Sequence, residues 1–165
     1  MDSNNIHRIL SKNKITKPYF KGVLPYDKIK DNIKPPKNKF LNAFWILNCD
    51  NSTLPGSHWL LIFYDYFTGG WDLFDSLSLD PTIFYPYLFK HLKNINYKIN
   101  KTPFQIQPFN SIFCGPHCIY FAYLRCSNIN SEQIYKFFYK KNNLEYNKTI
   151  IQNGGAQKLI NMAPK

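Results

Sequence analysis

The sequence has no run of about 20 apolar residues, the length that a membrane-spanning helix needs. Its first residues, Met1 to Asn5, are polar, so we expect no signal peptide. Acidic residues are scarce, because ten Asp and Glu stand against 21 Lys and Arg. These absences argue against a membrane protein and against an acidic disordered chain. The share of hydrophobic residues, 44%, is enough for a folded domain with its own core.

Positive charge is absent from the middle of the chain. Residues 41–80 contain five Asp and no Lys or Arg, which gives a net charge of −5. Residues 1–40 carry +7 and residues 81–165 carry +9, so the whole chain has a net charge of +11. Basic segments on both sides of an acidic middle segment predict two separate features. One is a basic surface that binds a polyanion, and the other is a functional site in the middle of the chain. The alternative is a solvated basic face that only keeps the protein soluble.

Cysteine is rare as well, and the four residues are Cys49, Cys114, Cys118 and Cys126. The last three lie at positions i, i+4 and i+12 of one segment, and two cysteines one helical turn apart are poor disulfide partners. The simpler interpretation is a set of free thiols in a reducing, intracellular setting.

No internal repeat and no long linker divides the chain, so we expect residues 1–165 to form one domain. Apolar and aromatic runs predict strands over 40–48, 58–67, 71–74 and, broken at Pro103, 97–107. Gly69 and Gly70 predict a tight turn, so residues 58–75 should form a hairpin. Helices are predicted over 5–12, 81–94, 114–125 and 131–141, and a loop over 27–39. The fold class is therefore α+β.

Two of the predicted helices carry more specific expectations. The helix over 81–94 should be capped by Asp80, and its apolar face should consist of Ile83, Tyr87, Leu88, His91 and Leu92. The helix over 114–125 has a row of small side chains at positions 114, 118 and 122 that continues to 126. Such a row would let the helix lie close against a sheet.

Cys114 stands at the start of its predicted helix and is followed by Gly115. The positive end of a helix dipole and the free N–H groups there stabilise a thiolate, and can lower a cysteine pKa from about 8.5 to between about 3.5 and 7.5. The same N–H groups can bind the oxyanion of an acyl-transfer intermediate. Gly115 would leave room for a substrate, and Gln107 would add a side-chain amide donor. The alternative is a buried, inert core cysteine.

A nucleophilic cysteine needs a base, and the base needs a group that orients it. Among four histidines, His58 is the best placed, because it begins an apolar strand directly after a Pro-Gly-Ser loop. Asp75 ends the partner strand of the predicted hairpin and should lie opposite His58. The alternatives are a structural histidine and a capping aspartate, or a metal site formed by Cys114, His117 and Cys118.

Taken in order, these residues resemble the adenovirus-type maturation proteases, the adenain family of cysteine proteases in the ubiquitin-like-protein protease clan. The resemblance runs through most of the chain and implies an adenovirus-like, virophage or Polinton-like virus as the source. The motifs that carry it are Pro18-Tyr19-Phe20 with Gly22, Ile46-Leu47-Asn48, His58-Trp59, Asp75, Gln107, Asn110-Ser111, Cys114-Gly115 and Cys118.

The resemblance implies a papain-like, adenain-like fold in which a central mixed sheet packs against the helix that bears the nucleophile. The implied reaction is the cleavage of virion and capsid precursor proteins at Gly-containing sites, through a thioester intermediate. The implied catalytic residues are Cys114 as nucleophile, His58 as base, Asp75 as the group that orients the base, and Gln107 as an oxyanion donor. The implied binding residues are Trp59, which would pack beside the imidazole, Asn48 and Gly115.

No cofactor or metal is expected for the chemistry, and the resemblance implies non-specific binding to viral DNA and activation by it. Some relatives also use a peptide tethered by a disulfide, but no cysteine lies between Cys49 and Cys114, where the tethering thiol would be expected. We therefore expect no disulfide-linked activator. We expect a monomer without membrane contact, in the virion and in the cytoplasm or nucleus of the infected host cell. Gly154-Gly155 is interpreted as a turn or helix end, or as a self-cleavage site.

Two other functions stay open on the sequence. One is a deubiquitinase or ubiquitin-like-protein isopeptidase of the same clan, for which we would expect a glycine-only channel and a large second binding surface. The other is a non-enzymatic, basic nucleic-acid-binding protein, in which Cys114 would not react with thiol-directed reagents.

Overall fold

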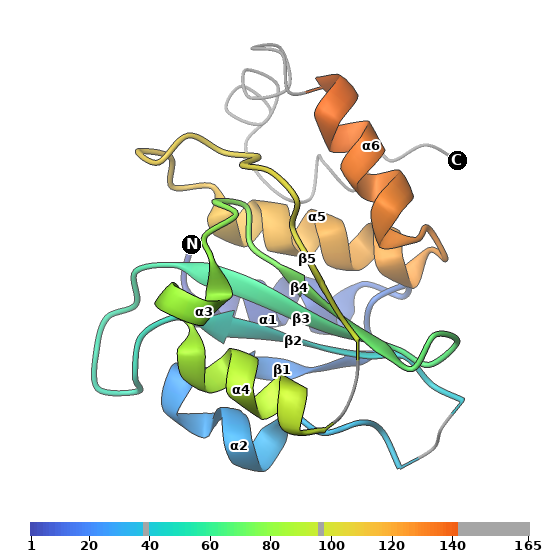
Figure 1. Ribbon diagram of the computed structural model, residues 1–165, viewed down its shortest axis with the longest axis horizontal. Coiled ribbons are helices and arrows are strands. Elements are labelled where there is room, and N and C mark those ends of the chain that lie inside the picture. Colours follow the sequence, from blue (N-terminus) through green and yellow to red (C-terminus); the bar gives the residue numbers. More distant parts are fainter. Residues whose placement is uncertain (38–39, 96–97, 142–165) are drawn as a thin grey trace.

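The structure of the protein, a computed structural model, describes residues 1–37, 40–95 and 98–141 (Figure 1). Its strands are β1 (Phe20–Leu24), β2 (Ala43–Asn48), β3 (Trp59–Asp65), β4 (Gly70–Phe74) and β5 (Ile99–Lys101). Its helices are α1 (Ser3–Lys12), the 3-10 helix η1 (Tyr26–Lys28), α2 (Ile29–Asn32), α3 (Pro81–Phe84), α4 (Pro86–Asn94), α5 (Cys114–Cys126) and α6 (Ser131–Lys141). The segment Gly154-Gly155 lies outside the described residues.

The five strands form one mixed sheet in the order β1-β2-β3-β4-β5. β3 is antiparallel to both of its neighbours, β2 and β4, whereas the outer strands β1 and β5 run parallel to theirs. α5, which begins at Cys114, packs on the sheet along β3. The predicted α+β class, with a mixed sheet packed against the helix that bears Cys114, is confirmed.

Helices cover both faces of the sheet, which explains why the central strands are apolar without alternation. In β2, Phe44 and Ile46 pack into the core on the side of α1, α5 and α6. The intervening Trp45 and Leu47 pack into the second core, on the side of α2 and α4. Figure 1 shows the same layers, with α5 and α6 on one side of the sheet and α2 and α4 on the other. The buried sheet fixes the strand ends from which the candidate site projects.

α5 lies close to β3, as the row of small side chains predicted. The buried thiol of Cys118 is 3.4 Å from the carbonyl oxygen of Trp59. Pro116 is accommodated in the first turn, where no helical N–H is needed. The predicted helices at 5–12 and 131–141 are confirmed as α1 and α6. None of the helices in the described ranges is long and apolar enough to cross a membrane.

The helix predicted over 81–94 is interrupted, which corrects the sequence analysis. Asp80 caps its start as expected, but Pro86 lacks the N–H that a continuous helix needs. A proline also disfavours the helical conformation of the preceding residue, and Tyr85 has φ −135° and ψ 48°. α3 therefore ends there and α4 begins in a new direction. The predicted apolar face is split into a buried pair, Leu88 and Leu92, and an exposed pair, Ile83 and Tyr87.

Several strand and loop boundaries also differ from the prediction. The segment 27–39, predicted as a loop, includes the end of η1 and all of α2, and the strand predicted from Phe40 begins at Ala43. The strand predicted over 97–107 is reduced to β5, because the N–H of Gln107 turns to the carbonyl oxygen of Ser76 instead of a neighbouring strand. β1 was not predicted, and its register is interrupted at Gly22, whose φ of +140° suits glycine.

Candidate active site

Three polar side chains meet where β3 begins, β4 ends and α5 begins. His58 directly precedes β3, Asp75 directly follows β4, and Cys114 is the first residue of α5. Because β3 and β4 are antiparallel neighbours, the start of one lies beside the end of the other. The register pairs Leu61 with Phe74, so the histidine and the aspartate are offset by two positions and meet through their side chains.

His58 and Asp75 form a short hydrogen-bonded pair. Nε2 of His58 lies 2.7 Å from Oδ1 of Asp75, and both side chains are largely buried. This bond occupies Nε2 and leaves Nδ1 as the ring nitrogen available to Cys114. Burial acts to lower the pKa of His58, but the hydrogen bonds and charges of Asp75 and Cys114 outweigh it and raise that pKa to about 9. The two neighbours therefore favour the charged form of the imidazole.

Cys114 is only 7% exposed and begins a helix that no side chain caps. Burial acts to raise the pKa of its thiol, but the hydrogen bond and charge of His58 lower it below the usual value overall. The backbone N–H groups of Trp59 and Gly115 act in the same direction. A lowered thiol pKa beside a raised imidazole pKa favours a thiolate–imidazolium pair, which is the arrangement of an activated thiol nucleophile.

The turn after β4 holds Asp75 in its orientation. Oδ1 accepts a hydrogen bond from the N–H of Leu77 at 2.9 Å, and Oδ2 accepts one from the N–H of Leu79 at 3.0 Å. The N–H of Asp75 itself donates to Oγ1 of Thr102 at 2.9 Å. Because both carboxylate oxygens have backbone donors, the carboxylate is held in the position from which it reaches His58.

Tyr85 also reaches Asp75, and this contact was missed from the sequence. Its hydroxyl donates to Oδ2 of Asp75 at 3.3 Å. Burial, together with the nearby Cys49 and Asp75, raises the pKa of Tyr85, so the hydroxyl keeps its proton and acts as a donor. No local sequence pattern marks this residue, and Tyr85 lies at the break between α3 and α4.

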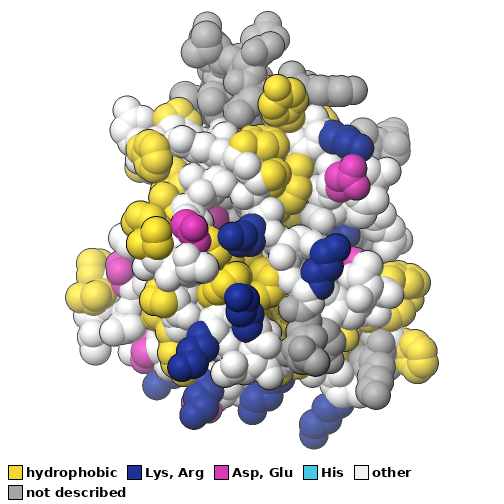
Figure 2. All heavy atoms as spheres, in the orientation of Figure 1, with side chains coloured by type: hydrophobic (Ala, Val, Ile, Leu, Met, Phe, Trp, Pro, Cys, Tyr) yellow, Lys and Arg dark blue, Asp and Glu magenta, His cyan; other side chains and the backbone are white. Residues whose placement is uncertain are grey.

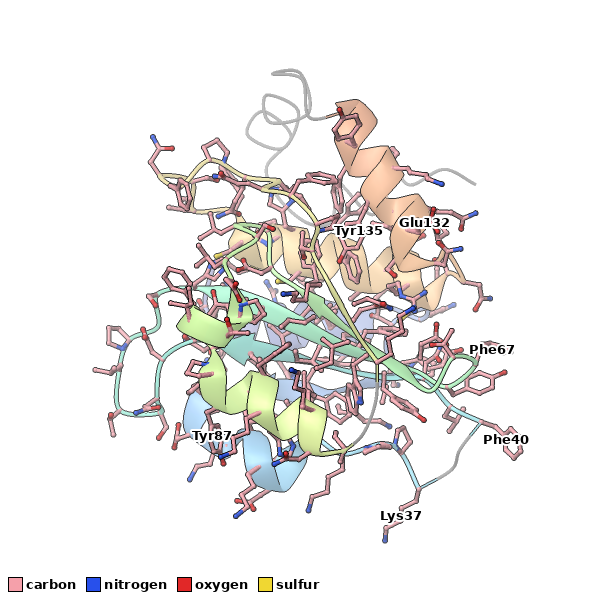
Figure 3. The ribbon with its side chains drawn as sticks, viewed as in Figure 1. Lys37, Phe40, Phe67, Tyr87, Glu132 and Tyr135 are labelled. Carbon is pink, nitrogen blue, oxygen red and sulfur yellow. The ribbon has the colours of Figure 1, made fainter. Side chains whose placement is uncertain are left out.

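α6 supports the same turn from the other side. Tyr135 points from α6 toward the sheet, and its hydroxyl oxygen lies 3.4 Å from Oγ1 of Thr102 (Figure 3). Thr102 in turn accepts the backbone hydrogen bond of Asp75. Two buried side chains therefore connect α6 to the backbone of the acid.

Gln107 is buried beside Ser76, the residue that follows Asp75. Its Oε1 accepts a hydrogen bond from the Ser76 hydroxyl at 3.1 Å, and its Nε2 donates to the carbonyl oxygen of Ser111 at 3.4 Å. The second bond is longer than a typical N–H···O bond, and a side-chain amide has two N–H donors. The structure thus places the amide in the loop that leads to Cys114, with one N–H left for another acceptor.

Trp59 and Met1 both lie beside Gly115. A Cβ added at Gly115 would lie 3.3 Å from Sδ of Met1 and 3.4 Å from the Trp59 ring. The indole N–H of Trp59 donates to the carbonyl oxygen of Met1 at 3.2 Å. Met1 therefore lies in the room that a side chain at residue 115 would take, and the expected role of Gly115 in substrate approach stays a prediction.

Asn48 lies at the edge of the site, at the end of β2. Its amide fills the space that a side chain at Gly56 would need, and Gly56 has a φ of +92°. Asn48 also lines a pocket of about 230 Å³ together with Leu54 and Pro55. The residue thus shapes the loop that leads into His58.

The histidine of α5, His117, lies in a different environment from His58. His117 is buried and packs edge-on against Phe138 of α6, with ring centroids 6.1 Å apart. Burial lowers its pKa to about 4. In residues 1–37, 40–95 and 98–141, no group of three His, Cys, Asp or Glu is arranged to hold a metal ion. All four cysteines are free thiols.

The sequence matches no protein-family model and no curated protein. Among solved structures, the fold is similar to that of the ASFV pS273R protease, with 18% identical residues and a TM-score of 0.46. That match covers 83% of this chain and 65% of the protease, so this chain spans less than two thirds of its length. The selenomethionine form of the same protease matches with 23% identity and a TM-score of 0.33, over 59% of this chain and 42% of that one.

Proposed function

We propose that the protein is a cysteine endopeptidase in which Cys114 is the nucleophile, His58 the general base and Asp75 the group that orients the base. The observation that carries the proposal is the 2.7 Å bond between His58 and Asp75, beside a thiol at the start of α5 that is close enough to raise the pKa of His58. Each pKa shift runs in the direction that thiolate chemistry requires.

The reaction begins from the thiolate–imidazolium pair. The sulfur of Cys114 attacks the carbonyl carbon of a peptide bond, and the carbonyl electrons move to the oxygen. His58 gives its proton to the leaving nitrogen, the C–N bond breaks, and a thioester remains. Neutral His58 then takes a proton from water, whose oxygen attacks the thioester, and the sulfur leaves as a thiolate. Asp75 keeps Nε2 bound throughout, so the moving proton is carried on Nδ1.

Two kinds of donor are available for the oxyanion. The first is the backbone N–H at the uncapped start of α5, where the helix dipole also favours negative charge. The second is the N–H of Gln107 that is not bonded to Ser111. Because this N–H is not used in the bond to Ser111, it can turn to a substrate oxygen, and we include Gln107 in the catalytic machinery.

For the substrate, we propose virion precursor proteins that are cleaved at Gly-containing sites, in the virion and in the infected host cell. The support is the ordered set of sequence motifs from Pro18-Tyr19-Phe20 to Cys118. A nearly buried thiol supports it as well, because Cys114 is more easily reached by a peptide bond whose neighbouring residue has no side chain.

Incubation with capsid precursor proteins tests the proposal. We expect the wild type to cut them and Cys114→Ala to lose cleavage, because no other group replaces the thiolate. Cys126→Ala is the matched control, since it makes the same change at the far end of α5 and should retain activity. Cleavage that survives in Cys114→Ala would contradict the assignment, as would a wild-type Cys114 that does not react with thiol-directed warheads.

A tag-release assay separates the same-clan alternative. If the wild type releases ubiquitin or a ubiquitin-like protein from a conjugate and leaves capsid precursors intact, the chemistry stands and the substrate class changes. Loss of that release in Cys114→Ala would then assign it to the same thiol.

A nucleic-acid partner is favoured by the surface charge. Lys93 and Lys101 both lie over the ring of Phe89, with their Nζ atoms 4.8 and 5.7 Å from its centroid. Figure 2 shows Lys and Arg side chains gathered over the lower part of the molecule, where α2 and α4 lie in Figure 1. We propose this basic face as a non-specific contact for viral DNA. Its affinity should fall steeply with salt, and affinity that is independent of salt would exclude such a contact.

A further inference from the structure

Met1 contacts the neighbours of both the base and the nucleophile. Its carbonyl oxygen accepts the indole N–H of Trp59, and its side chain lies against the backbone of Gly115. Trp59 follows His58 in the chain, and Gly115 follows Cys114. Figure 1 shows the N-terminal end of the chain beside the first turn of α5. Met1 therefore borders the candidate active site.

α1 fixes the position of Met1. The carboxylate of Asp2 caps this helix and accepts hydrogen bonds from the backbone and side-chain nitrogens of Asn5, at 2.8 and 2.9 Å. On the following turns, Ile6 and Leu10 are fully buried in the core beneath α5. A residue that directly precedes a capped and anchored helix has little freedom to leave its place. The position of Met1 is thus set by the packing of α1.

The contact matters because of the burial of the thiol. Cys114 is 7% exposed, whereas Met1, which lies beside Gly115 at the start of α5, is 45% exposed. Gly115 offers no Cβ there, and the thioether of Met1 fills the room that a Cβ would take. A reactant that approaches the sulfur from this side must pass the Met1 side chain.

We propose that Met1 is a specificity-determining residue, whose side chain forms a wall beside the Cys114 thiol and selects reactants with a small group, such as glycine, next to it. For its substrate this inference rests on the proposed function. Its steric part concerns only access to the thiol and is tested without proteolysis.

The first experiment compares the alkylation of Cys114 by a small reagent, iodoacetamide, and by a bulky one, N-phenylmaleimide. The full-length protein is used, residue 1 is varied behind a removable fusion, and peptide mass spectrometry resolves each cysteine. We expect Met1→Ala to raise the rate with the bulky reagent about tenfold and to change the rate with iodoacetamide by less than about twofold. Met1→Leu, which nearly conserves the side-chain volume, should behave like the wild type.

Substitutions at Asp2 change the position of Met1 without changing its side chain. Asp2→Ala removes the helix cap and should raise the ratio of bulky to small alkylation rates by less than Met1→Ala does. Asp2→Asn retains a capping side chain and should leave the ratio unchanged. If the ratio of bulky to small alkylation rates is the same in Met1→Ala, Asp2→Ala and the wild type, Met1 does not restrict access to the Cys114 thiol.

Cleavage of peptides gives a second readout. Peptides that differ only in Gly, Ala or Leu beside the scissile bond are compared. Relative to the Gly peptide, the cleavage rates of the Ala and Leu peptides should be higher in Met1→Ala than in the wild type. If the wild type cuts no peptide but the alkylation ratio responds to Met1→Ala, the proposed function fails and the wall stands. If the wild type cuts peptides and neither readout responds to residue 1, the function stands and the wall fails.

Discussion

The two ends of α5 each hold a buried charge cluster, and the clusters differ in what their charges can do. At the first residue of the helix, Cys114 interacts with His58, which is bonded to Asp75. In the last turn, Arg125 is bonded to Asp72 at 2.8 Å. Both ends suit the helix dipole, because a thiolate lies at the positive end and a guanidinium at the negative end. Both aspartates come from the same strand, β4, or from the residue after it.

The cluster at the end of α5 holds a permanent positive charge, that of Arg125. The guanidinium of Arg125 donates to Asp72, to Asp65 at 2.7 Å and to the carbonyl oxygen of Ile129 at 3.0 Å. It also lies 4.6 Å from the centroid of the Phe63 ring. Arginine stays protonated in proteins, so the pairing is permanent and has a structural role.

The cluster at the start of α5 is built from groups that exchange protons. The pKa of Cys114 is lowered and the pKa of His58 is raised to about 9, because each group favours the charged form of the other. The cluster at the end of α5 thus contributes to the stability of the fold, and the cluster at its start contributes to the reactivity of Cys114. Substitutions at the two ends should change these two properties independently.

Arg125→Met is expected to cause the largest change. It would leave Asp65 and Asp72 buried without their cation and should lower the free energy of unfolding by about 3–5 kcal/mol. Urea denaturation measures this loss. The rate at which iodoacetamide alkylates Cys114 under native conditions should stay the same, and a parallel fall in that rate would show that the two ends are not independent.

A matched control for this substitution lies on α6. Lys136 is exposed and forms a 2.8 Å ion pair with Glu132, which is labelled in Figure 3. Lys136→Met should change the free energy of unfolding by no more than about 0.5 kcal/mol, because solvent screens exposed pairs. An equal loss in both variants would mean that burial is not what makes Arg125 important.

Asp75→Asn is expected to have the next largest effect, this time on reactivity. The rate of cleavage should fall about 10²- to 10³-fold, because the base loses the group that orients it. In the wild type, activity should decline as the pH rises through about 9, where His58 loses its proton. Removal of the carboxylate lowers the pKa of His58, so this decline should move to lower pH. A pH profile of Cys114 alkylation that does not move would rule out this role for Asp75.

Tyr85→Phe should give the smallest change. It removes one of two donors to Oδ2 of Asp75 and leaves the N–H of Leu79, so we expect a loss of about fivefold in the cleavage rate. Without this hydrogen bond, the negative charge of Asp75 is less neutralised, so Asp75 should raise the pKa of His58 further. The alkaline decline of activity should therefore move to higher pH, opposite to Asp75→Asn. A shift in the same direction in both variants would contradict this account of Tyr85.

Much of the reactive end could be predicted from the sequence, because short-range features place its parts. The turn at Gly69 and Gly70 makes a hairpin, and the hairpin brings His58 near Asp75. Cys114 was placed at a helix start by the pattern that follows it, and α5 begins there. The α+β class followed from the same runs of strand and helix.

The missed residues depend on contacts between distant segments. Trp59 and Met1 are 58 residues apart and meet only because α1 packs beneath α5. Arg125 and Asp72 are 53 residues apart, and no local pattern links them. Tyr85 was assigned to a continuous helix, and its true direction follows from the break before Pro86. Periodicity along the chain cannot show such contacts, because they depend on how complete elements pack.

The register of β4 on β3 determines the positions of both Asp72 and Asp75. The strand pairs Asp72 with Phe63 in register, and a slip by one residue would turn the aspartate to the opposite face of the sheet. The same slip would deprive Arg125 of its partner and carry Asp75 out of reach of His58. The ion pair between Arg125 and Asp72 therefore favours the correct register of the hairpin. A chain that forms this pair has also aligned Asp75 with His58. Folded but misaligned molecules should accordingly be rare among newly made copies.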